Sequence, residues 1–314
     1  MTDRVKIAAI GRPTPYIASG LAAAFDVQAE PSAQTRGLAV CFGPQRIDAG
    51  FVERLPQLEL VSSFGVGYDH IDAAALAARG IVVTHTPDVL TDEVADLSVG
   101  LLIATVRQLP QADRYLRAGG WLQRPYPLTP TLRGRTVGIL GLGRIGKAIA
   151  TRLQAFGLTI EYHGRRPQAD APYRYRPTLL ELARSCDVLI VAASGGAETR
   201  HLVNAEVLAA LGPQGVLINI GRGSVVDERA LIDALREHRI LAAGLDVFDD
   251  EPRVPAELIA MEQVVLLPHV ASASEHTRNA MGQLVIDNLV AWFDGRGALT
   301  PVPECRELAA RRRG

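Results

Sequence analysis

The sequence lacks the features that mark several specialised classes of protein. It has only 3 cysteines among 314 residues, and Cys41, Cys186 and Cys305 lie far apart, which excludes a secreted disulfide scaffold and a closely spaced zinc site. No apolar run reaches the length of a membrane-spanning helix. Neither sign of charge dominates, with 33 basic and 34 acidic residues, and this balance gives no support for nucleic-acid binding.

The N-terminus also lacks the apolar core of a signal peptide, since its apolar stretch is only about five residues long. What is present is typical of a folded globular protein, with 48% hydrophobic and 21% charged residues. A chain of 314 residues is comfortable for two domains of ordinary size. We therefore expect a cytoplasmic, two-domain protein without a metal site.

Short apolar runs alternate with helix-like stretches, a pattern typical of parallel α/β architecture. A long helix is expected from Val94 to about Arg117, with Thr91 as its N-cap, followed by a loop over 119–130 that is rich in proline and glycine. Strands are expected in two series, the first at 5–10, 37–41, 58–63 and 81–84, and the second at 135–140, 159–163, 187–191, 215–220, 243–247 and 264–267.

These elements predict two Rossmann-like, doubly wound parallel-sheet domains with the active-site cleft between them. Six strands with alternating crossovers suit a dinucleotide-binding domain, which we assign to residues 97–286. A final amphipathic helix, at about 274–293, is expected to return to the first domain. The substrate-binding domain would then be discontinuous and contain residues 1–96 and 287–314.

A glycine-rich turn follows the first strand of the second series. Its pattern is G-x-G-x-x-G, in which the first glycine permits a tight turn, the second lets a pyrophosphate approach, and the third lets helix and strand pack closely. The N–H groups at the start of the next helix would face the phosphates. We therefore expect a dinucleotide to bind at Gly141, Leu142, Gly143, Arg144, Ile145 and Gly146.

The residues after the next strand indicate which dinucleotide binds. NAD-binding folds place an acid there, about 20 residues after the loop, to bind the ribose hydroxyls. Here Gly164 is followed by Arg165 and Arg166, whose guanidinium groups suit a 2′-phosphate, and Glu161 lies inside the strand rather than at its tip. The sequence favours NADP(H) over NAD(H). The alternative is a pair of solvated surface arginines.

Three later segments place polar residues at the predicted carboxyl ends of strands, where open α/β sheets bind their ligands. They cover residues 219–223, 244–252 and 267–272. Each has an ordinary structural interpretation when taken alone. Arg222 could be a turn residue, Glu251 the start of an acidic loop, and His269 a core histidine.

Together, and in this order behind the glycine loop, these segments resemble the D-isomer-specific 2-hydroxyacid dehydrogenase family. Within it the chain is most similar to the glyoxylate/hydroxypyruvate reductase branch, which includes hydroxyphenylpyruvate reductases, because of residues 87–92 and the missing strand-end acid. The chain departs from the family at 191–196, where the usual Cys-Pro-like step is absent. The resemblance covers most of the chain, through residues 65–72, 91–96, 141–146, 221–227, 246–252 and 268–269.

This resemblance implies reduction of a small 2-oxo acid, such as glyoxylate or hydroxypyruvate, to the D-2-hydroxy acid with NADPH. The reaction needs a hydride, a proton for the carbonyl oxygen and a cation for the carboxylate. Arg222 can bind the carboxylate and polarise the carbonyl, and His269 can donate the proton. The family implies that Glu251 hydrogen-bonds the imidazole, orients it and keeps it protonated.

The resemblance also implies contacts around these three residues. Backbone N–H groups of Val66 and Gly67 would complete the carboxylate site, and Ser272 would contact the substrate. Ile220 and Asp246 would contact the cofactor, with Asp246 near the nicotinamide.

Two functional alternatives stay open, namely a nucleotide-sensing regulatory or corepressor protein on the same fold and a dehydrogenase of the family with a different substrate. The nearly all-round apolar helix at 94–106 predicts a homodimer with this helix at the interface. Trp121 would cover a substrate pocket of either subunit or form a dimer contact.

Overall fold

The computed structural model describes residues 4–43 and 45–311, and the chain divides into two compact units. Unit 1 consists of Met1–Leu90 and Ser274–Gly314, and unit 2 of Thr91–Ala273. The boundaries expected from the sequence, at 96/97 and 286/287, fall inside the two helices that begin at Thr91 and Glu275. The helix that begins at Thr91 packs on the sheet of unit 2, and the helix that begins at Glu275 packs on the sheet of unit 1. The boundary between the units therefore lies at the start of each helix, not within it.

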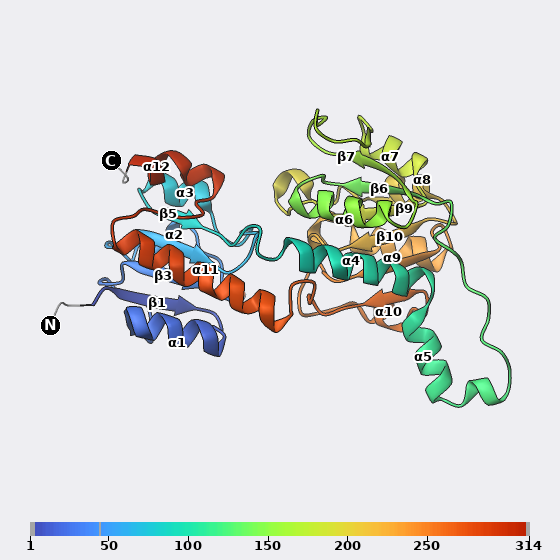
Figure 1. Cartoon of the computed structure of the whole chain (residues 1–314), viewed down its shortest axis with the longest axis horizontal. Helices are drawn as coiled ribbons and strands as arrows, with labels where there is room; N and C mark the ends of the chain where they lie inside the picture. The colour runs from blue at the N-terminus through green and yellow to red at the C-terminus, as the bar shows by residue number, and fades with distance from the viewer. Residues whose placement is uncertain (1–3, 44, 312–314) are drawn as a thin grey trace. The chain divides into compact units, whose positions relative to one another are not determined.

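Unit 1 is a five-stranded parallel sheet with the strand order β2-β1-β3-β4-β5. Helices α1 and α11 pack against each other, and α11 also contacts β3 and β4 (Figure 1). The elements of this unit are β1 (Lys6–Ile10), α1 (Pro15–Ala24), β2 (Asp26–Gln28), β3 (Gly37–Val40), α2 (Ala49–Val52), β4 (Leu60–Ser63), α3 (Ala73–Ala78), β5 (Val82–Thr84), α11 (Glu275–Phe293), η4 (Pro303–Cys305) and α12 (Arg306–Arg311).

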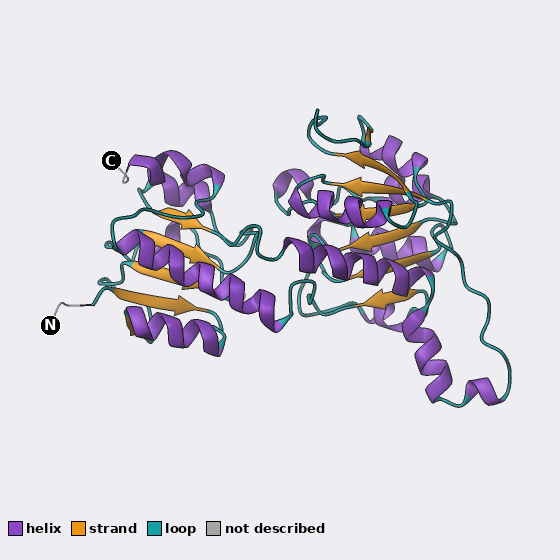
Figure 2. Cartoon of the chain, viewed as in Figure 1, coloured by secondary structure: helices purple, strands orange, loops and turns teal. Residues whose placement is uncertain are grey.

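Unit 2 is a seven-stranded parallel sheet with the order β12-β11-β10-β9-β6-β7-β8, and helices cover both of its faces (Figure 2). Chain order reverses between β6 and β9, which is the point where such sheets bind ligands. The elements are α4 (Thr91–Val106), α5 (Leu109–Arg117), η1 (Gly120–Leu122), β6 (Thr136–Leu140), α6 (Arg144–Gln154), β7 (Thr159–His163), β8 (Arg174–Tyr175), α7 (Leu179–Ser185), β9 (Val188–Val191), η2 (Ala197–Thr199), α8 (Ala205–Leu211), β10 (Val216–Asn219), η3 (Gly223–Val225), α9 (Glu228–Arg236), β11 (Ala242–Leu245), α10 (Ala256–Ala260) and β12 (Val264–Leu266).

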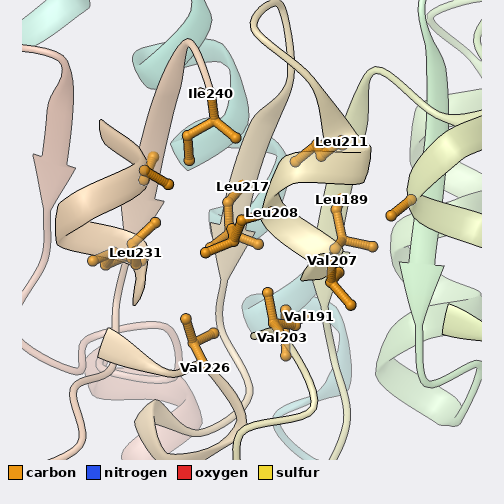
Figure 3. Close-up of a cluster of buried hydrophobic side chains, with 14 of the residues drawn as sticks. Leu189, Val191, Val203, Val207, Leu208, Leu211, Leu217, Val226, Leu231 and Ile240 are labelled. Atoms are coloured by element: carbon orange, nitrogen blue, oxygen red, sulfur yellow. The ribbon is translucent and has the colours of Figure 1, made fainter. Parts of the chain in front are cut away.

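The core of unit 2 explains why its strands are almost wholly apolar. Strands β9 and β10 are buried at every position, as expected for parallel strands covered on both faces. Side chains from α7, α8 and α9 join them in one cluster. Figure 3 shows the part of this cluster that includes α8 and α9. This cluster includes Leu189, Val207, Leu208, Leu217 and Leu231.

The two-domain parallel α/β prediction is confirmed, but a few elements differ from it. Edge strands β2 and β8 were not predicted, because their sequences DVQ and RY are mostly exposed and contain no apolar run. The helix predicted to reach Arg117 ends at Val106 instead. Gln108 adopts a left-handed backbone with φ 51°, and Pro110 lies in the first turn of α5. Thr91 is the first residue of α4 rather than its cap.

The apolar surface of helix α4 is covered within its own unit, because the helix packs on α6 and on β10, β11 and β12. The exposed apolar surface lies instead on residues 109–130, here called the α5 arm, which projects from the sheet of unit 2 (Figure 1). Its exposed apolar side chains are Leu109, Leu116, Trp121, Leu122 and Leu128.

Candidate active site

The glycine loop joins β6 to α6, and its geometry fits a dinucleotide. Gly141 has φ 96°, and a side chain there would meet the backbone of Ala193 at 2.9 Å. A side chain at Gly146 would collide with the carbonyl oxygen of Gly141, so the third glycine allows the helix to pack against the turn. Gly143 is the N-cap of α6 and is exposed, with open space above its Cα. That opening is where a pyrophosphate could approach the helix N-terminus.

The other predicted loop residues take different positions. Leu142 is buried, whereas Arg144 is exposed and Ile145 is half-buried in the first turn of α6. Gly164 directly follows β7, and Arg165 and Arg166 are exposed beyond it. Neither of these two arginines makes a hydrogen bond or ion pair within the described residues, so both cations face solvent.

Glu161, the other acid of this region, is occupied elsewhere. Its carboxylate accepts hydrogen bonds from Arg176 at 2.6 and 2.9 Å and from Ser185 at 2.6 Å. Burial raises the pKa of Glu161, but the bonds and charge of Arg176 and the Ser185 bond hold it below its usual value. Glu161 is therefore a structural ion-pair member of β7 and is not placed to bind a ribose.

Three neighbouring strands bring the polar segments together at one edge of the unit 2 sheet. Asn219 ends β10, Asp246 directly follows β11, and His269 lies three residues beyond β12. The Asp246 N–H donates to the Asn219 carbonyl at 2.9 Å, and the His269 N–H donates to the Asp246 carbonyl at 2.8 Å. Since parallel strands end on the same side, residues distant in sequence meet here.

Arg222 is held by the residues around its turn. The Asn219 side chain donates to the Arg222 carbonyl at 3.0 Å and accepts from the Gly221 N–H at 3.1 Å. A side chain at Gly223 would collide with the Phe248 backbone, so only glycine lets this turn pack against the segment that leads to Glu251. The Arg222 guanidinium donates to the Gly221 carbonyl at 2.8 Å.

Glu251 and His269 form a hydrogen-bonded pair. Glu251 Oε2 lies 2.7 Å from His269 Nδ1, and Glu251 Oε1 accepts from the Phe248 N–H at 3.1 Å. Burial raises the pKa of Glu251, but the bond and charge of His269, the Phe248 bond and the charge of Arg222 together hold it below its usual value. An ionised Glu251 requires a proton on Nδ1, which leaves Nε2 to face a substrate.

The histidine stands on a constrained turn. The backbone of His269 has φ 53°, in the left-handed region that residues other than glycine rarely adopt. The fully buried Asp246 carboxylate accepts from the N–H groups of Val270 at 2.7 Å and Ala271 at 2.9 Å. Burial raises the pKa of Asp246 despite these two bonds. Asp246 therefore organises the His269 turn, a role that its sequence position did not indicate.

The remaining predicted residues are placed as follows. Ile220 is buried between Asn219 and the arginine turn, and its N–H donates to the Val191 carbonyl at 3.2 Å. Ser272 is half-buried, three residues after His269.

Val66 and Gly67 belong to unit 1, in the loop that follows β4 and Phe64. The Val66 carbonyl lies 2.9 Å from His85 Nδ1, and the Gly65 carbonyl accepts from the Thr86 N–H at 2.8 Å. The N–H groups of Val66 and Gly67 donate to no other group in the described part of the chain. This loop thus has bonded carbonyls and available N–H groups, which suits an anion.

The positioning residues Asn219 and His85 had no assigned role in the sequence-based site. Asn219 gave a weak signal, as a polar residue ending an otherwise apolar strand. Among residues 4–43 and 45–311, no helix is long and apolar enough to cross a membrane. The same residues contain no group of three or more His, Cys, Asp or Glu side chains that could hold a metal ion.

Comparison with known proteins identifies close relatives. The profile of the family described as "D-isomer specific 2-hydroxyacid dehydrogenase, NAD binding domain" matches residues 99–271. The chain is 53% identical over 255 residues to glyoxylate/hydroxypyruvate reductase A of Arabidopsis thaliana, covering 81% of this chain and 82% of the relative. It is 50% identical over 255 residues to hydroxyphenylpyruvate reductase of Plectranthus scutellarioides, with the same coverage of 81% and 82%.

A solved structure is similar over nearly the whole chain. It is the NADPH-dependent glyoxylate/hydroxypyruvate reductase of Sinorhizobium meliloti in complex with NADP and malonate. The two chains are 51% identical, the TM-score is 0.92, and the match covers 96% of this chain and 98% of that one.

Proposed function

Since the chain belongs to the D-isomer-specific 2-hydroxyacid dehydrogenase family, we propose that it reduces glyoxylate, hydroxypyruvate or a related small 2-oxo acid to the D-2-hydroxy acid with NADPH. Family membership makes it an NAD(P)-dependent oxidoreductase, so the regulatory-protein alternative is set aside. The names of its relatives support a 2-oxo acid as substrate.

The observation that carries the proposal is the hydrogen bond of 2.7 Å between Glu251 and His269, formed where the charge of Arg222 also acts on Glu251. The three side chains supply what reduction of a 2-oxo acid requires of a protein. Arg222 would bind the substrate carboxylate and polarise the adjacent carbonyl. His269 Nε2 would donate a proton to the carbonyl oxygen, and Glu251 would stabilise the imidazolium before the transfer.

The glycine loop, the N-terminus of α6 and the two exposed arginines would hold the cofactor, which supplies the hydride when bound. Arg165 and Arg166 are the residues that would select NADPH, because their charges face solvent just beyond β7. The N–H groups of Val66 and Gly67 would bind an anionic oxygen of the substrate, and Ser272 would contact it.

We also propose a homodimer. The exposed apolar side chains of the α5 arm form the surface that a second copy would cover. Trp121, with 68% of its surface exposed, would contact either the partner or its substrate pocket. The cytoplasmic location expected from the sequence stays a prediction.

The test is a set of initial rates with NADPH and glyoxylate, hydroxypyruvate, pyruvate or phenylpyruvate. We expect kcat/KM to be highest for glyoxylate or hydroxypyruvate. Equal or faster reduction of phenylpyruvate would move the assignment to the larger substrates, and no oxidation of NADPH with any 2-oxo acid would refute it.

A further inference from the structure

Residues 164–170, here called the arginine loop, are tied at both ends to the surrounding unit 2 structure. At the first end, the Tyr175 hydroxyl donates to the Gly164 carbonyl at 3.1 Å. At the second end, Asp170 forms an ion pair of 2.7 Å with Lys147 of α6. The loop is therefore attached to β8 and to the helix that begins at the glycine loop.

A third connection lies in the middle of the arginine loop and involves Gln168. Its backbone N–H donates to the buried Tyr162 hydroxyl at 2.8 Å. Its side-chain Nε2 donates to the Leu142 carbonyl at 2.7 Å, and Leu142 lies between the first two glycines of the glycine loop. One half-buried side chain thus joins the loop expected to bind the pyrophosphate to the loop that carries Arg165 and Arg166.

This connection matters because arginine side chains lose much conformational freedom when they bind a phosphate. A fixed backbone lowers the additional ordering that binding requires. The bond from Gln168 to Leu142 holds two residues that are 26 apart in sequence at a set distance. The side chains of Arg165 and Arg166 are not part of these bonds and stay exposed, so they can reach a ligand.

We propose that Gln168 is a positioning residue for NADPH, whose side-chain amide fixes Arg165 and Arg166 relative to the glycine loop, so that both meet the 2′-phosphate while the pyrophosphate is bound. This inference rests on the proposed use of NADPH. NADH has no 2′-phosphate, so its binding does not depend on where the arginines stand.

The test is a Gln168→Leu variant, which keeps the side-chain size and removes the bond to Leu142. Calorimetric titration should give a Kd for NADP⁺ about 3- to 10-fold higher than that of the wild type, as expected for one lost hydrogen bond. The Kd for NAD⁺ should change less than about twofold on the same scale. With saturating NADPH, kcat should be unchanged while KM for NADPH rises.

Two further variants make the test specific. Tyr162→Phe keeps the buried ring but removes the hydroxyl that accepts the bond from the Gln168 N–H. This variant should also raise the Kd for NADP⁺. Gln154→Leu is the matched control, because Gln154 lies on the same helix as Lys147 and its side-chain oxygen accepts a bond from the Tyr173 hydroxyl. It should leave both Kd values unchanged.

The outcomes separate this inference from the assignment of the cofactor. If the wild type binds NADP⁺ and NAD⁺ equally, both are overturned. If Arg165→Ala/Arg166→Ala abolishes the preference for NADP⁺ while Gln168→Leu and Tyr162→Phe retain it, only the positioning role is overturned. An equal loss of NADP⁺ and NAD⁺ affinity in Gln168→Leu would also overturn it, because that result means a general effect on the glycine loop.

Discussion

Glu251 and His269 are 18 residues apart in sequence, yet Glu251 Oε2 lies 2.7 Å from His269 Nδ1. The other oxygen of Glu251 accepts the Phe248 N–H, so both oxygens of the carboxylate are fixed. The backbone of His269 is fixed in turn by the Asp246 carbonyl. The imidazole is thus held from its ring and from its backbone, as a group that must deliver a proton at a set position requires.

Replacing His269 with Asn should lower kcat by about 10²–10⁴-fold while NADP⁺ binding is retained, because the general acid is lost. Asparagine tolerates the left-handed backbone that His269 adopts, so the fold should be preserved. The control is His238→Asn, since His238 has the same φ of 53°. If His269→Asn kept more than about half the wild-type kcat, the proton would have to come from another group.

The Glu251 carboxylate predicts a pH dependence of stability. Its pKa in the folded protein lies below the ordinary value of 4.5, so its ionised form stabilises the fold above that pH. This stabilisation is lost as pH falls from 4.5 through the lowered pKa. The difference in Tm between wild type and Glu251→Gln should therefore be largest near neutral pH and should narrow below pH 4.5. A difference that stays constant from pH 7 to pH 4 would contradict the ion pair.

Light scattering at micromolar concentration should give twice the monomer mass of 33.7 kDa. Leu116→Glu/Leu122→Glu should shift the protein toward the monomer, since both side chains belong to the exposed apolar surface of the α5 arm. The control is Phe156→Glu in the turn after α6, where an apolar side chain outside the arm is 51% exposed. A monomeric wild type would refute the dimer, and a dimeric double variant would exclude the arm as its interface.

The cofactor preference should be movable by two substitutions. A side chain at Gly164 would meet nothing within 4 Å, so Gly164→Asp fits without rearrangement. Combined with Arg165→Ala, it adds repulsion of the 2′-phosphate and removes attraction, and the ratio of kcat/KM should move toward NADH. Gly164→Ala is the control for the added side chain. An unchanged ratio in the double variant would place 2′-phosphate recognition elsewhere.

The parts of the fold predicted well were those with a strong local pattern. Buried strands such as β9 and β10 are continuous apolar runs, and the glycine loop has its own spacing. Edge strands β2 and β8 and the break at Gln108 were missed. The two strands are mostly exposed and contain no apolar run, and the break depends on a left-handed residue that carries no glycine signal.

The site shows the same division. Arg222, Glu251 and His269 were found because each stands in a segment with family spacing. Two of the bonds that position them are local, from Asn219 to Arg222 and from Phe248 to Glu251. The bonds between Asp246 and the His269 turn arise only when β11 and β12 are placed side by side. No local pattern in the sequence contains that information.

The most direct measurement is the ratio of kcat/KM for NADPH to that for NADH, with glyoxylate or hydroxypyruvate as substrate at low ionic strength. The absence of an acid at Gly164 and the charges of Arg165 and Arg166 predict a ratio of about 10 to 1000. The ratio should shrink as salt screens the two exposed arginines. Equal use of the two cofactors at low salt would contradict the account.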